Sequence, residues 1–362
     1  MSTLKVDSIE NGGNAVNFTT NLQAGNGFVK REYTSSATAP AGANSGALWW
    51  DTGNSVLKIN IVGVWYEVSA SLPPTPTWLG SRGVFTGINT SGNATSNVIE
   101  YLTIPTPGNA ADFGDLTTAT KTLGSCSNIT RAVFGGGAAA GNTNRIEYVT
   151  VGTLGNSVDF GDLTTSRDGV SGAGDGSRGL FAGDTNVIDY ITIATTGNAT
   201  DFGDLITAAS TSAAVNDATR AVFAGGYGGG SLDVIQYVTV QTTGNATDFG
   251  NLSSGRPTPS GLGDATRGVF GGGWNAAFNA SVDIIEYITI QTTGDATDFG
   301  NLTVSRAGCG GASDGTYGVF SGGYTTAFSN VIDYITIQTA GNATDFGDAT
   351  IVSSAKSGCS GT

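Results

Sequence analysis

Acidic side chains are the groups in this sequence that could carry acid–base chemistry, because its 362 residues include no His and three Cys. Paired carboxylates could hydrolyse glycosidic bonds. Most of these carboxylates, however, return at equivalent positions of an internal repeat. One position holds Glu100, Glu147, Asp189, Gln236, Glu286 and Asp333, and another holds Asp112, Asp159, Asp201, Asp248, Asp298 and Asp345.

A catalytic pair breaks the symmetry of a repeat, whereas a residue that returns in every copy stabilises the copy. The sequence therefore predicts no catalytic residue and no enzyme. Asx turns account well for the Asn-Ala-Thr-Asp and Asp-Phe-Gly segments. The alternative, a glycan-degrading enzyme, would need an unrepeated pair, and the sequence offers only scattered candidates such as Asp168, Asp184 and Asp295.

Metal and redox chemistry are poorly supported by the residue types present. Without His there is no Ser-His-Asp or Cys-His pair and no imidazole metal ligand. The three Cys form no CxxC motif, so no cofactor and no metal site is predicted. Calcium at the Asp/Asn turns stays open, although the EF-hand spacing is absent. Cys309 and Cys359 are interpreted as small buried thiols at matching places on neighbouring strands.

The charge balance limits the partners. The chain has 15 Lys and Arg against 29 Asp and Glu, a net charge of -14, and this argues against nucleic-acid binding. No apolar run is long enough for a signal peptide or a bilayer span, so we expect no membrane insertion and assembly in a cytoplasm.

Three signatures recur six times between residues 78 and 362, and they predict the fold. The first begins with a basic or aromatic residue and ends in an apolar residue and Phe: Arg82, Arg131, Arg178, Arg220, Arg267 and Tyr317 open it. The recurring Arg is interpreted as a solvated or salt-bridged turn residue. The second is a β-branched run around Tyr101, Tyr148, Tyr190, Tyr237, Tyr287 and Tyr334, and the third is Asp-Phe-Gly around Phe113, Phe160, Phe202, Phe249, Phe299 and Phe346.

The spacings separate a fixed part of each repeat from a variable loop. Tyr to Phe is 12 residues in all six copies, whereas the Phe of the first signature precedes the Tyr by 16, 14, 9, 14, 17 and 14 residues. Each copy contains four short strands, the first expected over residues 306–311 in the last copy. Four strands every 42 to 50 residues predict an all-β, six-bladed β-propeller. The tail 355–362 aligns with 305–312, with Cys359 matching Cys309, and would complete blade one.

All the variable loops lie on one face of such a propeller, and aromatic residues gather in those of blades four to six. We predict a ligand-binding face for a host-surface glycan or protein. Arg256 and Arg306, which open their inner strands, start from the same face. The alternative is that the rings fold back over their own loops. The predicted aromatic residues are Tyr227, Trp274, Phe278, Tyr324 and Phe328.

Residues 1–71 share none of these signatures and are predicted to be a separate β-rich domain, joined by a Pro-rich linker at 72–77. Residues 47–54 and 56–60 indicate a hairpin, and 64–68 would add a third strand. The aromatic residues of this domain could contact a partner or another copy of the chain, or could form an ordinary small core. They are Trp49, Trp50, Trp65 and Tyr66.

Two resemblances add to these predictions. The order of Arg, Gly-Gly, Tyr strand and outer aromatic, seen in 305–349 and repeated over 78–362, is similar to kelch repeats, with Phe where those usually carry Trp. Residues 4–9 and 46–51, with Trp65 and Tyr66, resemble the N-terminal parts of phage tail-fibre and other virion proteins, notably those of cyanobacterial phages. That resemblance implies a virion protein that attaches to other virion proteins through residues 1–71, as a homo-oligomer with a trimer favoured. It leaves a receptor-binding fibre and a purely structural decoration protein both open.

Overall fold

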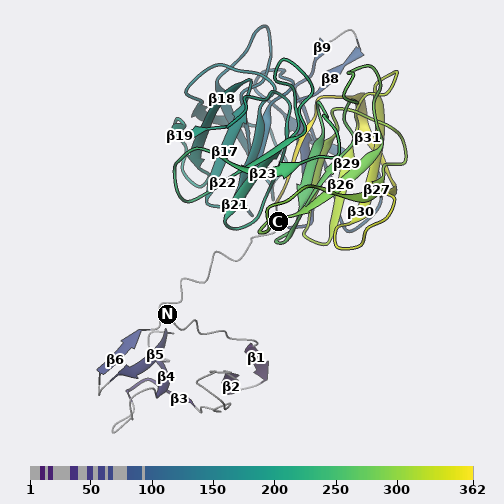
Figure 1. The fold of residues 1–362 in the computed structure, drawn as a ribbon. Helices are drawn as coiled ribbons and strands as arrows, with labels where there is room; N and C mark the ends of the chain where they lie inside the picture. Colours follow the sequence, from purple (N-terminus) through teal and green to yellow (C-terminus); the bar gives the residue numbers. More distant parts are fainter. Residues whose placement is uncertain are drawn as a thin grey trace. The chain divides into compact units, whose positions relative to one another are not determined.

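Six four-stranded antiparallel sheets form the blades of a β-propeller (Figure 1). The computed structural model describes residues 9–12, 15–18, 33–39, 47–51, 56–61, 64–67, 80–91 and 94–361. The chain divides into two units, Met1–Pro73 and Pro74–Thr362. Within the described ranges every regular element is a strand, which confirms the all-β, six-bladed prediction.

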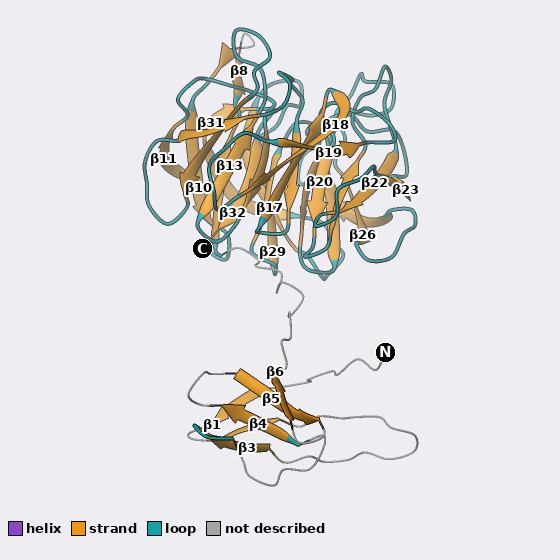
Figure 2. Ribbon diagram, turned by 90° about the vertical axis from the view of Figure 1, so that its left-hand side faces the viewer, coloured by secondary structure: helices purple, strands orange, loops and turns teal. Residues whose placement is uncertain are grey.

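The inner strands of neighbouring blades contact one another around the ring, and each blade runs from its inner strand to an outer strand at the rim. Figure 2 shows the sheets of the propeller from the side. Blades one to three are β32 (Ser357–Gly361), β7 (Arg82–Thr86), β10 (Val98–Thr103) and β11 (Ala111–Asp115); β12 (Gly124–Ser127), β13 (Arg131–Gly135), β14 (Arg145–Thr150) and β15 (Val158–Asp162); and β16 (Ser171–Gly174), β17 (Arg178–Gly183), β18 (Thr185–Thr192) and β19 (Thr200–Asp204).

Blades four to six follow the same order from the channel to the rim. They are β20 (Ala213–Asn216), β21 (Arg220–Ala224), β22 (Val234–Thr239) and β23 (Thr247–Asn251); β24 (Ser260–Gly263), β25 (Arg267–Gly271), β26 (Ile284–Thr289) and β27 (Thr297–Asn301); and β28 (Gly310–Ser313), β29 (Tyr317–Ser321), β30 (Ser329–Thr336) and β31 (Thr344–Ser353). The variable loop of blade one carries a small hairpin, β8 (Asn89–Thr90) and β9 (Ala94–Thr95).

The core lies between neighbouring blades, because the second strand of each blade is buried on both faces. Within every blade the repeated Tyr and Phe meet edge to face, with ring centroids 5.9 to 6.1 Å apart. The ladder between third and fourth strands shifts register at the same place in every blade, at the Phe of Asp-Phe-Gly. This bulge turns the Phe into the core.

The glycine after that Phe is required by the packing of one blade on the next. At Gly203, φ is +144°, and a Cβ there would lie 2.4 Å from the carbonyl oxygen of Gly244 in the following blade. The blades hydrogen-bond at the same contact, where Gly244 N donates to Phe202 O at 2.8 Å and Ala246 N to Asp204 O at 2.8 Å. The same close approach to the next blade recurs at the equivalent glycines Gly114, Gly161, Gly250 and Gly300, so this position of the repeat requires Gly.

The C-terminal strand closes the ring, as predicted, but in a different register. β32 pairs with β7, with Ser357 opposite Thr86 and Cys359 opposite Val84. In blade two, Cys126 lies opposite the equivalent Val133, so Cys359 matches Cys126, and the predicted match with Cys309 is wrong by three residues. Inner strands made of Gly, Ser and Ala carry too few distinctive side chains for sequence alignment to fix their register. For the same reason the inner strand of blade six begins at Gly310, whereas 306 was predicted.

In the N-terminal unit, β4 (Leu48–Asp51), β5 (Val56–Ile61) and β6 (Val64–Glu67) form the predicted antiparallel succession. The sequence did not predict β3 (Tyr33–Ser36), which pairs parallel with β4, or the hairpin of β1 (Ile9–Gly12) and β2 (Ala15–Phe18). The linker 72–77 lies outside the described residues.

Candidate functional site

The arginines predicted to lie on the binding face are buried, which corrects that part of the prediction. Arg256 is 1% exposed and pairs with Glu286. Arg306 is 0% exposed and donates to Asp333 at 2.7 Å and to Gly322 O at 2.8 Å. Each guanidinium binds the repeated acidic residue of its own blade, so neither can meet a ligand at the surface.

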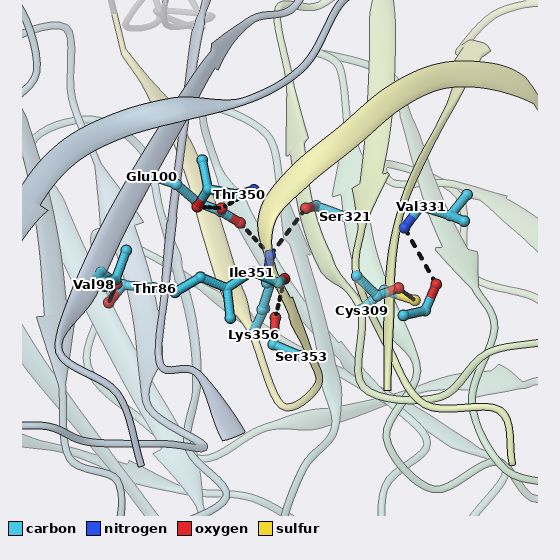
Figure 3. Close-up of polar contacts among 12 residues, drawn as sticks. Thr86, Val98, Glu100, Cys309, Ser321, Val331, Thr350, Ile351, Ser353 and Lys356 are labelled. Atoms are coloured by element: carbon cyan, nitrogen blue, oxygen red, sulfur yellow. Dashed lines mark hydrogen bonds and ion pairs between the residues drawn. The ribbon is translucent and has the colours of Figure 1, made fainter. Parts of the chain in front are cut away.

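This ion pair explains the repeated acidic position. Arg167 pairs with Asp189 at 2.7 Å in blade three, as Arg256 and Arg306 pair with their partners in blades five and six. In blade one, Ser353 stands where the others have Arg, and the cation comes from Lys356, three residues later, which binds Glu100 (Figure 3). Burial lowers the pKa of Lys356, and the Glu100 carboxylate opposes that shift. Lys356 thereby ties the C-terminal strand to the blade that it completes.

Blades two and four show what happens where this arginine is missing. Blade four has Ala209 at that position and the neutral Gln236 at the acidic position, and Gln236 bonds to Ile206 N at 2.8 Å and Thr207 O at 3.0 Å. Blade two keeps Glu147, which accepts from Ser157 at 2.6 Å and takes its cation from Arg145 at 3.3 Å. The acidic position is thus structural in every blade.

The other recurring arginine joins neighbouring blades and is no solvated turn residue, contrary to the prediction. Arg131 Nη1 donates to Ile193 O of the next blade at 3.0 Å, and its guanidinium lies 4.4 Å from the Tyr148 ring centroid. The same two contacts recur at four further arginines: Arg82, Arg178, Arg220 and Arg267. Tyr317 replaces this arginine in blade six and packs on Tyr334.

The face that carries the variable loops, called here the loop face, has one position in each of five blades that lies beside the start of the inner strand. It follows the second strand, and its backbone N–H donates to the residue ahead of the inner strand, as Trp274 N does to Pro257 O at 2.8 Å. We call this the lip position. It is occupied by Asn89, Ala138, Tyr227, Trp274 and Tyr324 in blades one, two, four, five and six.

All five predicted aromatic residues lie together on the loop face. Ring centroids are 5.9 Å apart for Tyr227 and Phe278, 5.4 Å for Phe278 and Trp274, 5.9 Å for Trp274 and Tyr324, and 5.3 Å for Tyr324 and Phe328. We call this run of rings across blades four to six the aromatic arc. Tyr227 is 44% and Phe278 50% exposed. Phe278 contacts Trp274, and Phe328 contacts Tyr324, within the same loop, so the rings cover part of their own loops and also leave apolar surface exposed.

The loop that carries Phe278 is ordered by its own hydrogen bonds. Phe278 N donates to Asn275 O at 2.8 Å, and the side chains of Asn275 and Asn279 bond at 2.7 Å. Phe278 itself has a φ of 56°, which is unusual for a bulky residue and costs free energy. The loop therefore holds an apolar ring in solvent through a strained backbone, a combination more typical of a binding surface than of a covering loop.

A cavity of about 370 Å³ opens at the mouth of the channel, inside the arc. Trp274, Tyr324 and Phe328 form one wall, and the opposite wall is made of small polar residues such as Ser125, Ser171 and Ser212. The lining contains three ionisable side chains: Lys356, whose ammonium is held by Glu100, Cys309, whose thiol pKa is raised by burial, and the phenol of Tyr324. The one cation in the lining is therefore already paired.

The three unrepeated carboxylates, Asp168, Asp184 and Asp295, lie outside the lining of this cavity. Asp295 accepts from Asn251 N at 2.9 Å at the blade contact, where the other blades have Asn. Asp168 and Asp184 are near enough to interact: burial, and then Asp184, raise the pKa of Asp168, while Lys121 opposes the shift. Neither belongs to the cavity lining. Among the described residues no cluster of three or more His, Cys, Asp or Glu side chains could hold a metal ion.

In the N-terminal unit, Trp49 is 4% exposed, meets Trp65 at 5.4 Å and donates to Ser36 O at 3.0 Å. These contacts favour the interpretation that Trp49 and Trp65 belong to a small core. The side chains of Trp50 and Tyr66 lie outside the described part of the chain. The described residues include no helix long and apolar enough to cross a membrane.

No protein-family model and no curated protein matches the chain. What is established is the β-propeller fold, which is consistent with a binding role, together with the positions of its side chains. The sequence missed Thr258, Ser260 and Asn89, which lie at the mouth. The one signal for the first two was the Pro-Thr-Pro-Ser segment 257–260, found in no other blade.

Proposed function

We propose that the chain is a non-enzymatic structural protein of a phage virion, a tail fibre or adhesin, whose propeller recognises a host-surface glycan or protein. The observation that carries the proposal is the aromatic arc, five rings from three blades on one face, two of them about half exposed. Clustered exposed aromatic residues anchor protein contacts and stack on ligand rings. The virion setting rests on the resemblance of residues 4–9 and 46–51 to virion proteins.

The location of the carboxylates supports a binding role over the glycan-degrading alternative. Inverting and retaining glycosidases both need two carboxyl groups that face the same bound sugar. Here the acidic residues equivalent to Glu286 are held in ion pairs and hydrogen bonds within blades. The Asp of each Asp-Phe-Gly segment is exposed on an outer strand, and the mouth cavity is lined by no Asp or Glu.

The test is binding of the fluorescently labelled full chain to intact bacterial cells, including cyanobacteria, and to a glycan array. Phe278→Ala should weaken binding at least about 10-fold, as expected for an anchor residue. Ile129→Ala is the matched control, because Ile129 is 49% exposed but lies in a turn of the opposite face. Equal losses in both variants, or no binding to any surface by the wild type, would refute an adhesin. Turnover of a host polysaccharide would refute the non-enzymatic role.

The attachment role of residues 1–71 and a trimeric state are part of the same proposal. They are tested by light scattering of the full chain and by co-purification of the chain with other proteins of a phage particle. A monomer that joins no particle would remove the virion setting without touching the binding role of the loop face.

A further inference from the structure

Blade five differs from the other blades at the channel mouth, because two of its hydroxyl groups lack a hydrogen-bond partner. Thr258 and Ser260 lie at the start of its inner strand, and neither hydroxyl oxygen has a hydrogen-bond partner within the protein although both are buried. Ser260 as a whole is 4% exposed. Buried polar atoms are nearly always paired, so each exception requires an explanation.

The other blades show that these hydroxyls are usually satisfied. At the place equivalent to Ser260, Ser171 donates to Ser212 O at 2.6 Å and Ser357 to Ser125 Oγ at 2.7 Å. At the place equivalent to Thr258, Thr122 and Thr211 each donate to the preceding carbonyl at 2.7 Å.

Pro257 and Pro259 stiffen this segment of blade five. Trp274, the largest of the lip residues, belongs to the same blade. Asn89 Oδ1, at the lip of blade one, is a third oxygen without a partner within the protein, and it lines the same cavity. The mouth therefore combines an aromatic wall with three oxygens free to bond and no free charge.

We infer that the mouth binds the terminal residue of a neutral saccharide, with one face of the sugar on Trp274 and Tyr324 and its hydroxyls at Thr258, Ser260 and Asn89. This inference rests on the proposed binding role and names its ligand. A sugar ring matches both parts of the site, because it has an apolar C–H face for an aromatic ring and several hydroxyls for the oxygens. A volume of about 370 Å³ is at the small end for ligand sites and suits one or two sugar residues.

The charges around the mouth exclude an anionic sugar. Lys356 is the one cation in the lining, and its ammonium is occupied by Glu100. Towards blades two and three the charged groups beside the mouth are Lys121, Asp168 and Asp184, which already interact with one another. A carboxylate or phosphate in the cavity would lose water and gain no free cation.

The experiment uses the full chain and saturation-transfer NMR with free D-glucose, D-galactose and D-mannose. N-acetylneuraminic acid and glucose 6-phosphate serve as charged comparisons. At least one neutral hexose should bind, and Ser260→Ala and Thr258→Val should each weaken it about 10-fold, because each removes a hydroxyl that only the ligand satisfies. Ser313→Ala is the control, because its hydroxyl donates to Gly263 O at 2.6 Å and it lies outside the lining of the mouth cavity. It should change affinity less than about twofold.

The outcomes separate this inference from the proposed function. If Phe278→Ala abolishes cell binding while no neutral hexose binds, or while Ser260→Ala and Ser313→Ala behave alike, the saccharide site is overturned and the adhesin stands. If a hexose binds as described but no cell or host glycan does, the saccharide site stands and the adhesin fails. Tighter binding of either charged sugar overturns the inference. Circular dichroism of each variant excludes loss of fold as the cause.

Discussion

The repeats of this chain serve as an internal comparison of how one buried position can be satisfied. Four blades pair an acid with Arg or Lys, blade two uses an arginine from a neighbouring position, and blade four replaces both partners by neutral residues. Replacing both members of a buried ion pair destabilises a protein much less than removing one member does. Removal of one member leaves the other charge buried and uncompensated. Blade four is a natural example of the double replacement.

Arg256→Ala should therefore destabilise the propeller by about 3–5 kcal/mol, because the Glu286 carboxylate stays buried without its cation. The double variant Arg256→Ala/Glu286→Gln reproduces the Ala209 and Gln236 of blade four and should recover more than half of that loss. The coupling free energy between Arg256 and Glu286 is measured by chemical denaturation of the wild type, both single variants and the double variant. Additive effects of the two substitutions would show that the pair is not the reason for the repeated position.

A second prediction at this scale concerns pH. Burial and Asp184 raise the pKa of Asp168 in the folded chain, so the folded state binds its proton more tightly than the unfolded state does. Stability should then fall as pH rises from the unfolded pKa through the folded one. Asp168→Asn should raise the melting temperature above that of the wild type at pH 7, and the difference should vanish near pH 3. Asp201→Asn, at an exposed repeated position, is the control; a difference independent of pH would contradict the assignment.

At the scale of elements, the bulge of each outer strand and the turn of the next blade form one contact repeated around the ring. Gly203→Ala places a methyl group against the Gly244 carbonyl and in an unfavourable φ, and should cost about 2–4 kcal/mol. Gly152→Ala is its counterpart, since a Cβ at Gly152 meets nothing within 4 Å. Thermal melts of the two variants give the comparison, and equal melting temperatures would mean that the contact is not tight.

Elements that carry distinctive side chains were predictable from the sequence, and those without them were not. The strands around Tyr190 and Phe202 follow from alternating β-branched residues and fixed spacing. The inner strands of Gly, Ser and Ala gave a register wrong by three residues at Cys359. The aromatic arc was predictable because Trp274 and Tyr324 stand out as residue types. The burial of Arg256 was not, since an arginine at the start of an inner strand can be exposed or paired, and its pairing with Glu286 depends on three-dimensional packing.

At the scale of the molecule, the chain forms two units, and the second contains its own closed ring of six blades. Each blade keeps its own inner and outer edge strands, and closure of the ring gives β7 the partner strand that its blade would otherwise lack. Closure depends on β32, the strand farthest along the chain, and on Lys356 just before it. The stability of the propeller should thus be independent of residues 1–73 but highly sensitive to the last seven residues.

Deletion of residues 1–73 should leave the propeller melting temperature unchanged. Deletion of 356–362 should lower it by at least about 10 °C, because Glu100 loses its cation and β7 its partner strand. Glu100→Gln in the shortened chain separates these two causes. It should restore the part of the melting temperature that was lost to the unpaired Glu100 carboxylate. The open β7 edge should still produce concentration-dependent association. Calorimetry and sedimentation of the four chains make the test. A shortened chain that stays monomeric and melts like the intact one would mean that β32 does not close the ring.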